Sequence, residues 1–235
     1  MKKQAQIICH QLIQVHKHGK SNSSTNKTSV NNDTSENEDS TDDEDYETKK
    51  SKNKVVWSNA SDWSKKELEE ASSKKLIPET MSGMDFTKPV TRKDFAAIAV
   101  KLYESISKKN AEKSSNNPFK DTNDEYVLKA FNLNITNGVS ETEFSPESQI
   151  TREQMATMML RALDKAGIKT EIDVEKAEKF VDEDEMHDWG KNAIYYMSDK
   201  GIIKGISTFE NRFGVSNNAT IEQAIAISLR CKKAL

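Results

Sequence analysis

The chain has 235 residues, of which 34% are hydrophobic and 31% charged, and this apolar content is low for a chain that packs throughout. Its 35 basic residues are interleaved with 38 acidic ones at a net charge of −3, so no basic face is available for a phosphate backbone and nucleic acid is not expected as a partner. No apolar run reaches the roughly 18 residues of a membrane-spanning helix, so none is expected.

The first 53 residues are predicted to form a disordered, partly acidic N-terminal arm. The chain begins Met1-Lys2-Lys3, as secretory signals do, but polar residues interrupt the apolar stretch that follows, so no export signal is recognised. Residues 17–53 hold one aliphatic residue, Val30, and one aromatic residue, Tyr46, and cannot bury enough apolar surface to become ordered. The acidic run at 36–47 is interpreted as a solvated tether, with calcium or polycation binding as the alternative.

Beyond residue 53, three segments repeat one pattern. Each has a threonine followed three residues later by Asp or Gln, which forms or resembles a reciprocal capping box and predicts a helix start. The three openings are Thr91-Arg92-Lys93-Asp94, Thr151-Arg152-Glu153-Gln154 and Thr220-Ile221-Glu222-Gln223. Apolar residues follow each opening at helical spacing, so each capped helix should place one face against a core.

A second helical stretch precedes each capped helix, over residues 63–75, 124–133 and 189–200. Asn134 and Gly201 suit the left-handed residue that ends such a helix, whereas Lys75 suits it less well. The loop that leads to each capping threonine contains a phenylalanine: Phe86, Phe144 or Phe213. Each segment also begins with an aromatic and an acidic residue, which are Trp57 with Asp62, Phe119 with Asp121, and Phe180 with Asp182.

These helix-loop-helix units are too small to have separate cores, so they should pack around a shared axis. We therefore predict a mainly α fold with three repeats in a pseudo-threefold arrangement. The repeats are expected at residues 54–112, 116–168 and 178–235, behind an arm at 1–53.

Together these features resemble the S-layer homology domain of bacterial cell-surface proteins, which is normally present as three tandem copies. The motifs that carry the resemblance are the threonine-led openings, Phe119-Lys120-Asp121, Phe144-Ser145-Pro146 and Gly201-Ile202-Ile203-Lys204-Gly205. The resemblance implies location at the cell surface and non-covalent anchoring to the wall of a Gram-positive type cell. The implied partner is a secondary cell-wall polysaccharide, often pyruvate-modified, held in grooves between the repeats. No enzymatic activity and no cofactor are implied.

The resemblance also implies that the arginine of the Thr-Arg motif contacts the acidic sugar, which here means Arg92 and Arg152. Ile221 replaces it in the third copy. This position serves neither the cap nor the core, so we expect its side chain to face a ligand beside free N–H groups of the helix start. The alternative is an exposed arginine paired with a nearby glutamate. The matching loop glycines, Gly138 and Gly205, either touch the sugar or only permit the turn.

Other candidate residues are weaker. Trp57, Trp63 and Trp189 are candidates for stacking on sugar rings, with packing in the core as the alternative. The group Cys9, His10, His16 and His18 lacks metal-ligand spacing, so no metal site is expected. His187 lies near two aspartates but has no nucleophile motif, so no catalytic residue is expected.

Two other functions stay open. In the first, the chain is a protein-interaction or structural scaffold that has lost glycan binding, which Ile221 and the irregular loop after Lys75 would allow. In the second, the chain is the anchoring fragment of a larger surface enzyme. Neither the wall polymer nor the oligomeric state follows from the sequence.

Overall fold

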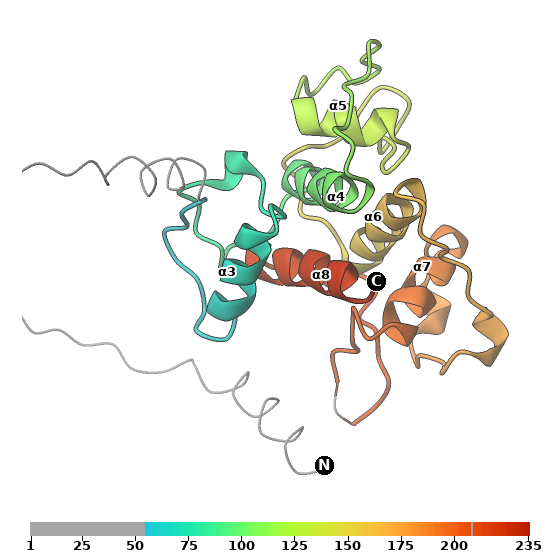
Figure 1. Cartoon of the computed structure of the whole chain (residues 1–235). Coiled ribbons are helices and arrows are strands. Elements are labelled where there is room, and N and C mark those ends of the chain that lie inside the picture. The colour runs from blue at the N-terminus through green and yellow to red at the C-terminus, as the bar shows by residue number, and fades with distance from the viewer. Residues whose placement is uncertain (1–54, 208) are drawn as a thin grey trace, which may run out of the picture. The chain divides into compact units, whose positions relative to one another are not determined.

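A computed structural model describes residues 55–207 and 209–235, and the predicted arm at 1–53 lies outside the described residues. The described part is mainly helical, with six α-helices, three short 3-10 helices and no β-strand (Figure 1). The described residues belong to one compact unit. Within these residues, no helix has the length and apolarity needed to cross a membrane.

The helices occur where the sequence pattern predicts them. The α-helices are α3 (Lys65–Ser73), α4 (Arg92–Ser107), α5 (Glu125–Asn132), α6 (Arg152–Lys165), α7 (Asp188–Asp199) and α8 (Ile221–Lys233). The 3-10 helices are η2 (Glu79–Met81), η3 (Val174–Lys176) and η4 (Glu183–Glu185). The predicted ends of α3, α5 and α7 differ from these bounds by at most two residues, which is the usual uncertainty of a helix end.

Threonine caps start α4, α6 and α8, as predicted. In each helix the threonine side chain accepts a hydrogen bond from the backbone N–H three residues on. In α6 and α8 the glutamine at that position also accepts from the threonine N–H, which completes a capping box. In α4 the Thr91 hydroxyl instead donates to Asp94 Oδ2 at 2.7 Å. These partners are at most three residues apart, so the sequence alone can predict them.

The predicted left-handed residues at the ends of α3, α5 and α7 are also confirmed. Lys75, Asn134 and Gly201 have φ values of 58°, 55° and 64°. The N–H of the following residue bonds back to the helix, as in Leu76 to Ala71 O at 2.9 Å. These following residues, Leu76, Ile135 and Ile202, are buried.

Helix packing links each segment to the next one along the chain. Helices α4, α6 and α8 contact one another, and each also contacts the first helix of another segment (Figure 1). Helix α5 packs on α4, α7 packs on α6, and α3 packs on α8. The first and last described helices are therefore partners. The core between the helices holds fully buried rings, among them Phe86, Phe95, Phe144, Tyr195 and Phe213.

Candidate functional site

The start of each capped helix lies against the loop of another segment. The N–H groups of the first two helical residues donate to backbone carbonyls in that loop. At the start of α4, the N–H groups of Arg92 and Lys93 donate to the carbonyls of Ser148 and Pro146, respectively. At the start of α6, those of Arg152 and Glu153 donate to Asn217 and Val215, and at the start of α8, those of Ile221 and Glu222 donate to Lys88 and Phe86. All six distances are 2.8–3.3 Å. Because the third N–H is taken by the threonine, the expectation of free N–H groups for an anion is wrong.

The side chains of Arg92 and Arg152 bind the same loops. Arg92 Nε donates to Phe144 O at 3.0 Å, and its guanidinium carbon lies 4.9 Å from the centre of the Phe144 ring. Arg152 repeats this contact with Phe213 O at 3.0 Å and the Phe213 ring at 4.8 Å. Each arginine also donates from Nη2 to a second carbonyl, Asn137 O at 3.4 Å or Lys204 O at 2.6 Å.

This geometry corrects the expectation that the arginine is free to face a ligand. It also corrects the alternative, because neither guanidinium pairs with a glutamate within the described residues. Arg92 is only 7% exposed. Burial lowers the pKa of Arg152 to about 10, the Asp182 carboxylate opposing the shift, so the guanidinium stays protonated at neutral pH. Both arginines therefore act as charged links between segments.

The two loop glycines follow the carbonyls that these arginines bind. A Cβ atom on Gly138 would lie 2.2 Å from Ser140 O, and one on Gly205 would lie 2.8 Å from Arg212 O. Both distances are too short for a side chain, so the loop itself requires glycine at each position. This requirement holds whether or not a sugar binds there.

The three tryptophans differ in their surroundings. Trp57 is partly buried and stacks on Phe86 at 5.6 Å between ring centres, so packing explains it. Trp63 and Trp189 are 43% and 49% exposed, and core packing therefore does not explain them. Trp189 also stacks on His187, with ring centres 5.1 Å apart. An exposed indole face remains in two of the three segments.

Two buried glutamates that the sequence pattern did not mark hold the starts of the outer helices. Glu153, 2% exposed, accepts from the N–H of His187 at 2.8 Å and lies 2.8 Å from His187 Nδ1, just before α7. Glu222, 4% exposed, accepts from the N–H of Ser61 at 2.8 Å and from Ser64 Oγ at 2.9 Å, just before α3. A carboxylate is favourable at a helix N-terminus. The sequence did contain a pattern that could have identified them, because a glutamate follows the capping threonine by two residues in the second and third segments.

Lys93 takes the corresponding place in α4, and a cavity of about 400 Å³ opens beside it. The apolar side chains of Met84 and Ala97 form part of the cavity wall. Three carboxylates, Asp94, Asp124 and Glu147, line the cavity with this one lysine, which pairs with Glu147. The excess of negative charge makes this cavity a poor place for an acidic ligand.

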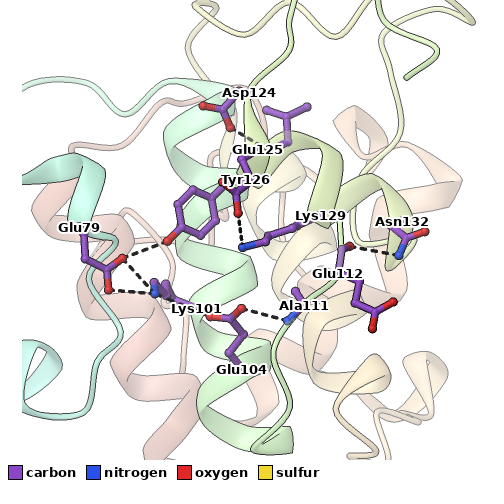
Figure 2. Close-up of polar contacts among 11 residues, drawn as sticks. Glu79, Lys101, Glu104, Ala111, Glu112, Asp124, Glu125, Tyr126, Lys129 and Asn132 are labelled. Atoms are coloured by element: carbon purple, nitrogen blue, oxygen red, sulfur yellow. Dashed lines mark hydrogen bonds and ion pairs between the residues drawn. The ribbon is translucent and has the colours of Figure 1, made fainter. Parts of the chain in front are cut away.

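A polar bridge borders this cavity, and Figure 2 shows its members. The Glu79 carboxylate of η2 lies 3.0 Å from Lys101 Nζ of α4 and accepts from the Tyr126 hydroxyl of α5 at 3.0 Å. Burial lowers the pKa of Lys101, but its contacts with Glu79 and Tyr126 together raise it more, so the net shift is upward. The bridge joins η2 and the two helices α4 and α5.

Two aspartates order the loops after the outer helices. Asp121 accepts from Phe144 N–H at 3.0 Å, and Asp182 accepts from Phe213 N–H at 2.8 Å and Gly214 N–H at 2.7 Å. In the first segment the backbone carbonyl of Asn59 accepts from Phe86 N–H instead, at 2.9 Å. Asp62, which the sequence pattern matched to these aspartates, is exposed and pairs with Lys65.

Replacing Asp182 with asparagine should lower the free energy of unfolding at pH 7 by about 2 kcal/mol, because charged hydrogen bonds are lost at a buried site. Burial raises the pKa of Asp182, but the surrounding backbone N–H donors, with those of Phe213 and Gly214 the strongest, together lower it to below its ordinary 3.8. Its stabilisation is thus complete above the unfolded pKa and lost as pH falls below 3.8 through the folded pKa. Urea titrations between pH 7 and 2.5 should show a smaller acid loss in the variant. An identical pH profile would contradict the assignment.

Potential metal ligands do not gather in the described part. Within residues 55–207 and 209–235, no group of three or more His, Cys, Asp or Glu residues is placed to hold an ion. Cys9, His10, His16 and His18 lie outside the described residues.

Comparison with known proteins connects these features to a family. Residues 118–156 and 179–225 match the model of the S-layer homology domain. The chain is 28% identical to exoglucanase XynX of Acetivibrio thermocellus, 31% to a cell surface protein of Thermoanaerobacter kivui and 26% to an amylopullulanase of Thermoanaerobacterium thermosulfurigenes. The alignments cover 75%, 48% and 71% of this chain but only 16%, 15% and 9% of the relatives.

The matched segments contain Arg152 and both loop glycines, whereas residues 54–112 lie outside them. The S-layer homology domain is an anchoring domain and not a catalytic one. The match and the similarity to a cell surface protein indicate association with the cell surface or cell wall. Residues 118–156 and 179–225 of this chain belong to the S-layer homology domain family.

Proposed function

We propose that the chain anchors a protein non-covalently to the cell wall by binding an acidic, for example pyruvylated, secondary cell-wall polysaccharide. The S-layer homology match supports wall anchoring. Two of the similar proteins are named as enzymes, and the small share of them that this chain covers supports an anchor that is one part of a larger surface protein. In this proposal the anchored cargo belongs to other parts of such a protein.

The proposed architecture has three repeats, at 54–112, 116–168 and 178–235, around a pseudo-threefold axis. The packing of α5 on α4, α7 on α6 and α3 on α8 supports it. Isolated β-bridges add a second repeated contact, joining Thr91 to Gln149, Thr151 to Asn218 and Pro89 to Thr220. The polymer would bind in the grooves between an inner helix and the outer helix packed on it.

The observation that carries the proposal is the exposure of Trp63 and Trp189. Each lies twelve residues before the left-handed residue that ends its outer helix, so both occupy the same place in their repeats. A large exposed aromatic side chain at two equivalent places suits the apolar face of a pyranose ring. Arg92, Arg152, Gly138 and Gly205 would hold the loops that border these grooves. Trp57 would contribute through the core.

The test uses purified wall sacculi, before and after removal of the secondary polymer, in sedimentation assays with the full chain. We expect pelleting only with polymer-bearing sacculi. A Trp63→Ala/Trp189→Ala double variant should bind about tenfold more weakly, equivalent to about 1.4 kcal/mol, with an unchanged unfolding midpoint. Phe209→Ala, which removes a fully exposed ring elsewhere, is the matched control and should bind normally. Equal pelleting with stripped sacculi would argue against the polymer as the ligand.

A protein-interaction scaffold is the second candidate. Ile221 is 1% exposed and cannot bind an anion, and the cavity beside Lys93 is lined by an excess of carboxylates. A scaffold would pellet with neither preparation of sacculi.

A further inference from the structure

The carboxyl-terminal ends of three helices meet at one part of the surface. Lys232 Nζ, near the end of α8, donates to Ser105 O in the last turn of α4 at 3.0 Å. Ser105 Oγ in turn donates to the backbone carbonyl of Lys74, the residue after α3, at 3.4 Å. Lys108 follows directly after α4. The ends of α3, α4 and α8 therefore lie side by side, and each carries lysine.

The lysine side chains at this place outnumber the carboxylates that they contact. Lys74 Nζ lies 3.9 Å and Lys233 Nζ 2.5 Å from the carboxylate of Glu70. Lys108 is exposed and pairs with no carboxylate of residues 55–207 or 209–235. The ammonium group of Lys232 has a carbonyl but no carboxylate side chain as its partner there. We call Lys74, Lys108, Lys232 and Lys233 the lysine face, in which one glutamate serves four cations.

The interleaving of basic and acidic residues along the chain predicts no basic face, and at this part of the fold that expectation is wrong. Lys74 and Lys108 are 34 residues apart, and Lys232 is a further 124 residues away. The packing of α3 on α8 and of α8 on α4 brings them together. Two more exposed lysines, Lys75 and Lys109, each directly follow a member of the lysine face. The fold therefore gathers positive charge that the sequence spreads out.

Capping of the helix ends accounts for only one of these lysines. A cation near the carboxyl-terminal end of a helix is favourable, because the last carbonyls are partly negative. Within the described residues, however, only the Lys232 side chain donates to such a carbonyl. Burial lowers the pKa of Lys232, and the positive charges of Lys108 and Lys74 lower it further. The lysines therefore repel one another, and an external anion would relieve this repulsion.

The charge is also divided along the axis of α4. Its first turn holds Asp94, which lines the cavity beside Lys93 together with Asp124 and Glu147. Lys108 comes fourteen residues after Asp94, which corresponds to about 21 Å along the helix. One end of α4 thus lies among carboxylates and the other among ammonium groups. Near a negatively charged surface, such an arrangement turns the lysine face toward that surface.

The chemistry of the lysine face suits a layer of anionic lipid headgroups. Lysine is a flexible point charge, so several lysines can hold mobile phosphate groups without selecting one shape. Leu235, 55% exposed, comes three residues after Lys232, and the backbone is still helical at Ala234. The leucine therefore lies on the same side of the helix as Lys232. An exposed apolar side chain beside lysines favours a lipid surface over a soluble polyanion, because it can enter the headgroup region.

We propose that the lysine face adsorbs to a membrane surface rich in anionic lipids, with its ammonium groups beside the lipid phosphates and Leu235 at the headgroup boundary. This surface is separate from the grooves of the proposed function and does not depend on them. The loops that border those grooves hold the start of α4, whereas the lysine face lies at its other end. A chain held by the wall at one end of this helix would contact the membrane at the other.

The test measures co-sedimentation of the full chain with vesicles of phosphatidylcholine, either alone or with about one third phosphatidylglycerol. We expect binding only to the anionic vesicles and a steep loss of binding as the salt concentration rises. Lys74→Gln/Lys108→Gln should weaken this binding about tenfold. Its unfolding midpoint should be unchanged, because both side chains are exposed. Lys65→Gln/Lys191→Gln removes the same charge near the starts of α3 and α7 and should bind normally.

Several outcomes would overturn the proposal. Equal losses of binding in the two double variants would show that only the net charge matters. Equal binding to both kinds of vesicle, or binding to neither, would remove the anionic lipid as the partner. If inorganic polyphosphate binds the full chain as tightly as the anionic vesicles at equal phosphate concentration, the lysine face takes a soluble polyanion instead of a membrane. The vesicles contain no wall polymer, so each of these outcomes leaves the proposed anchoring function to its own test.

Discussion

Replacing Glu222 with alanine is expected to lower the free energy of unfolding by about 3 kcal/mol, because several hydrogen bonds to one buried carboxylate are lost together. The carboxylate accepts from Ser61 N–H, Ser61 Oγ and Ser64 Oγ, all at 2.8–2.9 Å. Without it, these donors lose their acceptor beside the start of α3. The urea midpoint should fall by roughly 1.5 M for a typical dependence on denaturant.

Two further variants control this experiment. Glu222→Gln keeps one neutral acceptor and should cost about half as much, since hydrogen bonds to charged groups are about twice as strong. Lys93→Ala changes the corresponding residue of α4, whose ion pair with Glu147 is largely exposed, and should cost less than about 1 kcal/mol. Hydrogen exchange should show loss of protection in α3 before α5 in the Glu222→Ala protein. Equal costs for Glu222→Ala and Lys93→Ala would show that burial of the carboxylate adds nothing.

The elements predictable from the sequence are those whose partners are close along the chain. Thr151 and Gln154 bond to each other three residues apart, so the pattern and the interaction coincide. The left-handed ends behave alike, because the N–H of Ile135 bonds to the carbonyl of Ala130, only five residues back along the chain. Lys75 follows the same geometry despite its side chain. Local hydrogen bonding therefore predicted the helices and their ends.

Contacts between segments could not be predicted in this way. The unit defined by sequence runs from an outer helix to the following inner helix, but α5 packs on the preceding α4 and α3 packs on the last helix. The carbonyls that Arg92 binds are 45 and 52 residues away. Within its own unit this residue serves neither cap nor core, which is why it looked free. The role of Arg92 appears only when the second segment, which supplies both carbonyls, is in place.

The candidate site shows the same limit. Alignment of the repeats places Lys101 and Arg230 at one register, and that information is in the sequence. Only the packing of the outer helices shows that Glu79 and Glu67 neutralise these cations. The exposure of Trp63 and Trp189 also depends on the surroundings, since the same residue type at Trp57 packs against a core ring.

Replacing Arg152 with alanine is expected to lower the free energy of unfolding by about 3 kcal/mol, because two backbone carbonyls lose a charged donor and the Phe213 ring loses a cation. The lost contacts are those to Phe213 O at 3.0 Å, Lys204 O at 2.6 Å and the ring at 4.8 Å. Arg152→Lys keeps the charge but not the planar fork, so it should retain less than half of the stabilisation. Urea unfolding followed by circular dichroism measures both variants.

The control is Arg212→Ala, which removes a partly exposed arginine that pairs with Glu210 and Glu185 at the surface and should cost less than about 1 kcal/mol. Sacculus binding then separates structure from recognition. If Arg152 mainly links α6 to the loop before α8, the folded fraction of Arg152→Lys binds polymer almost normally while its unfolding midpoint is lowered. An Arg152→Lys protein with wild-type stability but no polymer binding would instead place Arg152 at the ligand. Unchanged stability would mean that the arginine does not hold the loop before α8, so the lost binding would reflect a lost contact with the polymer.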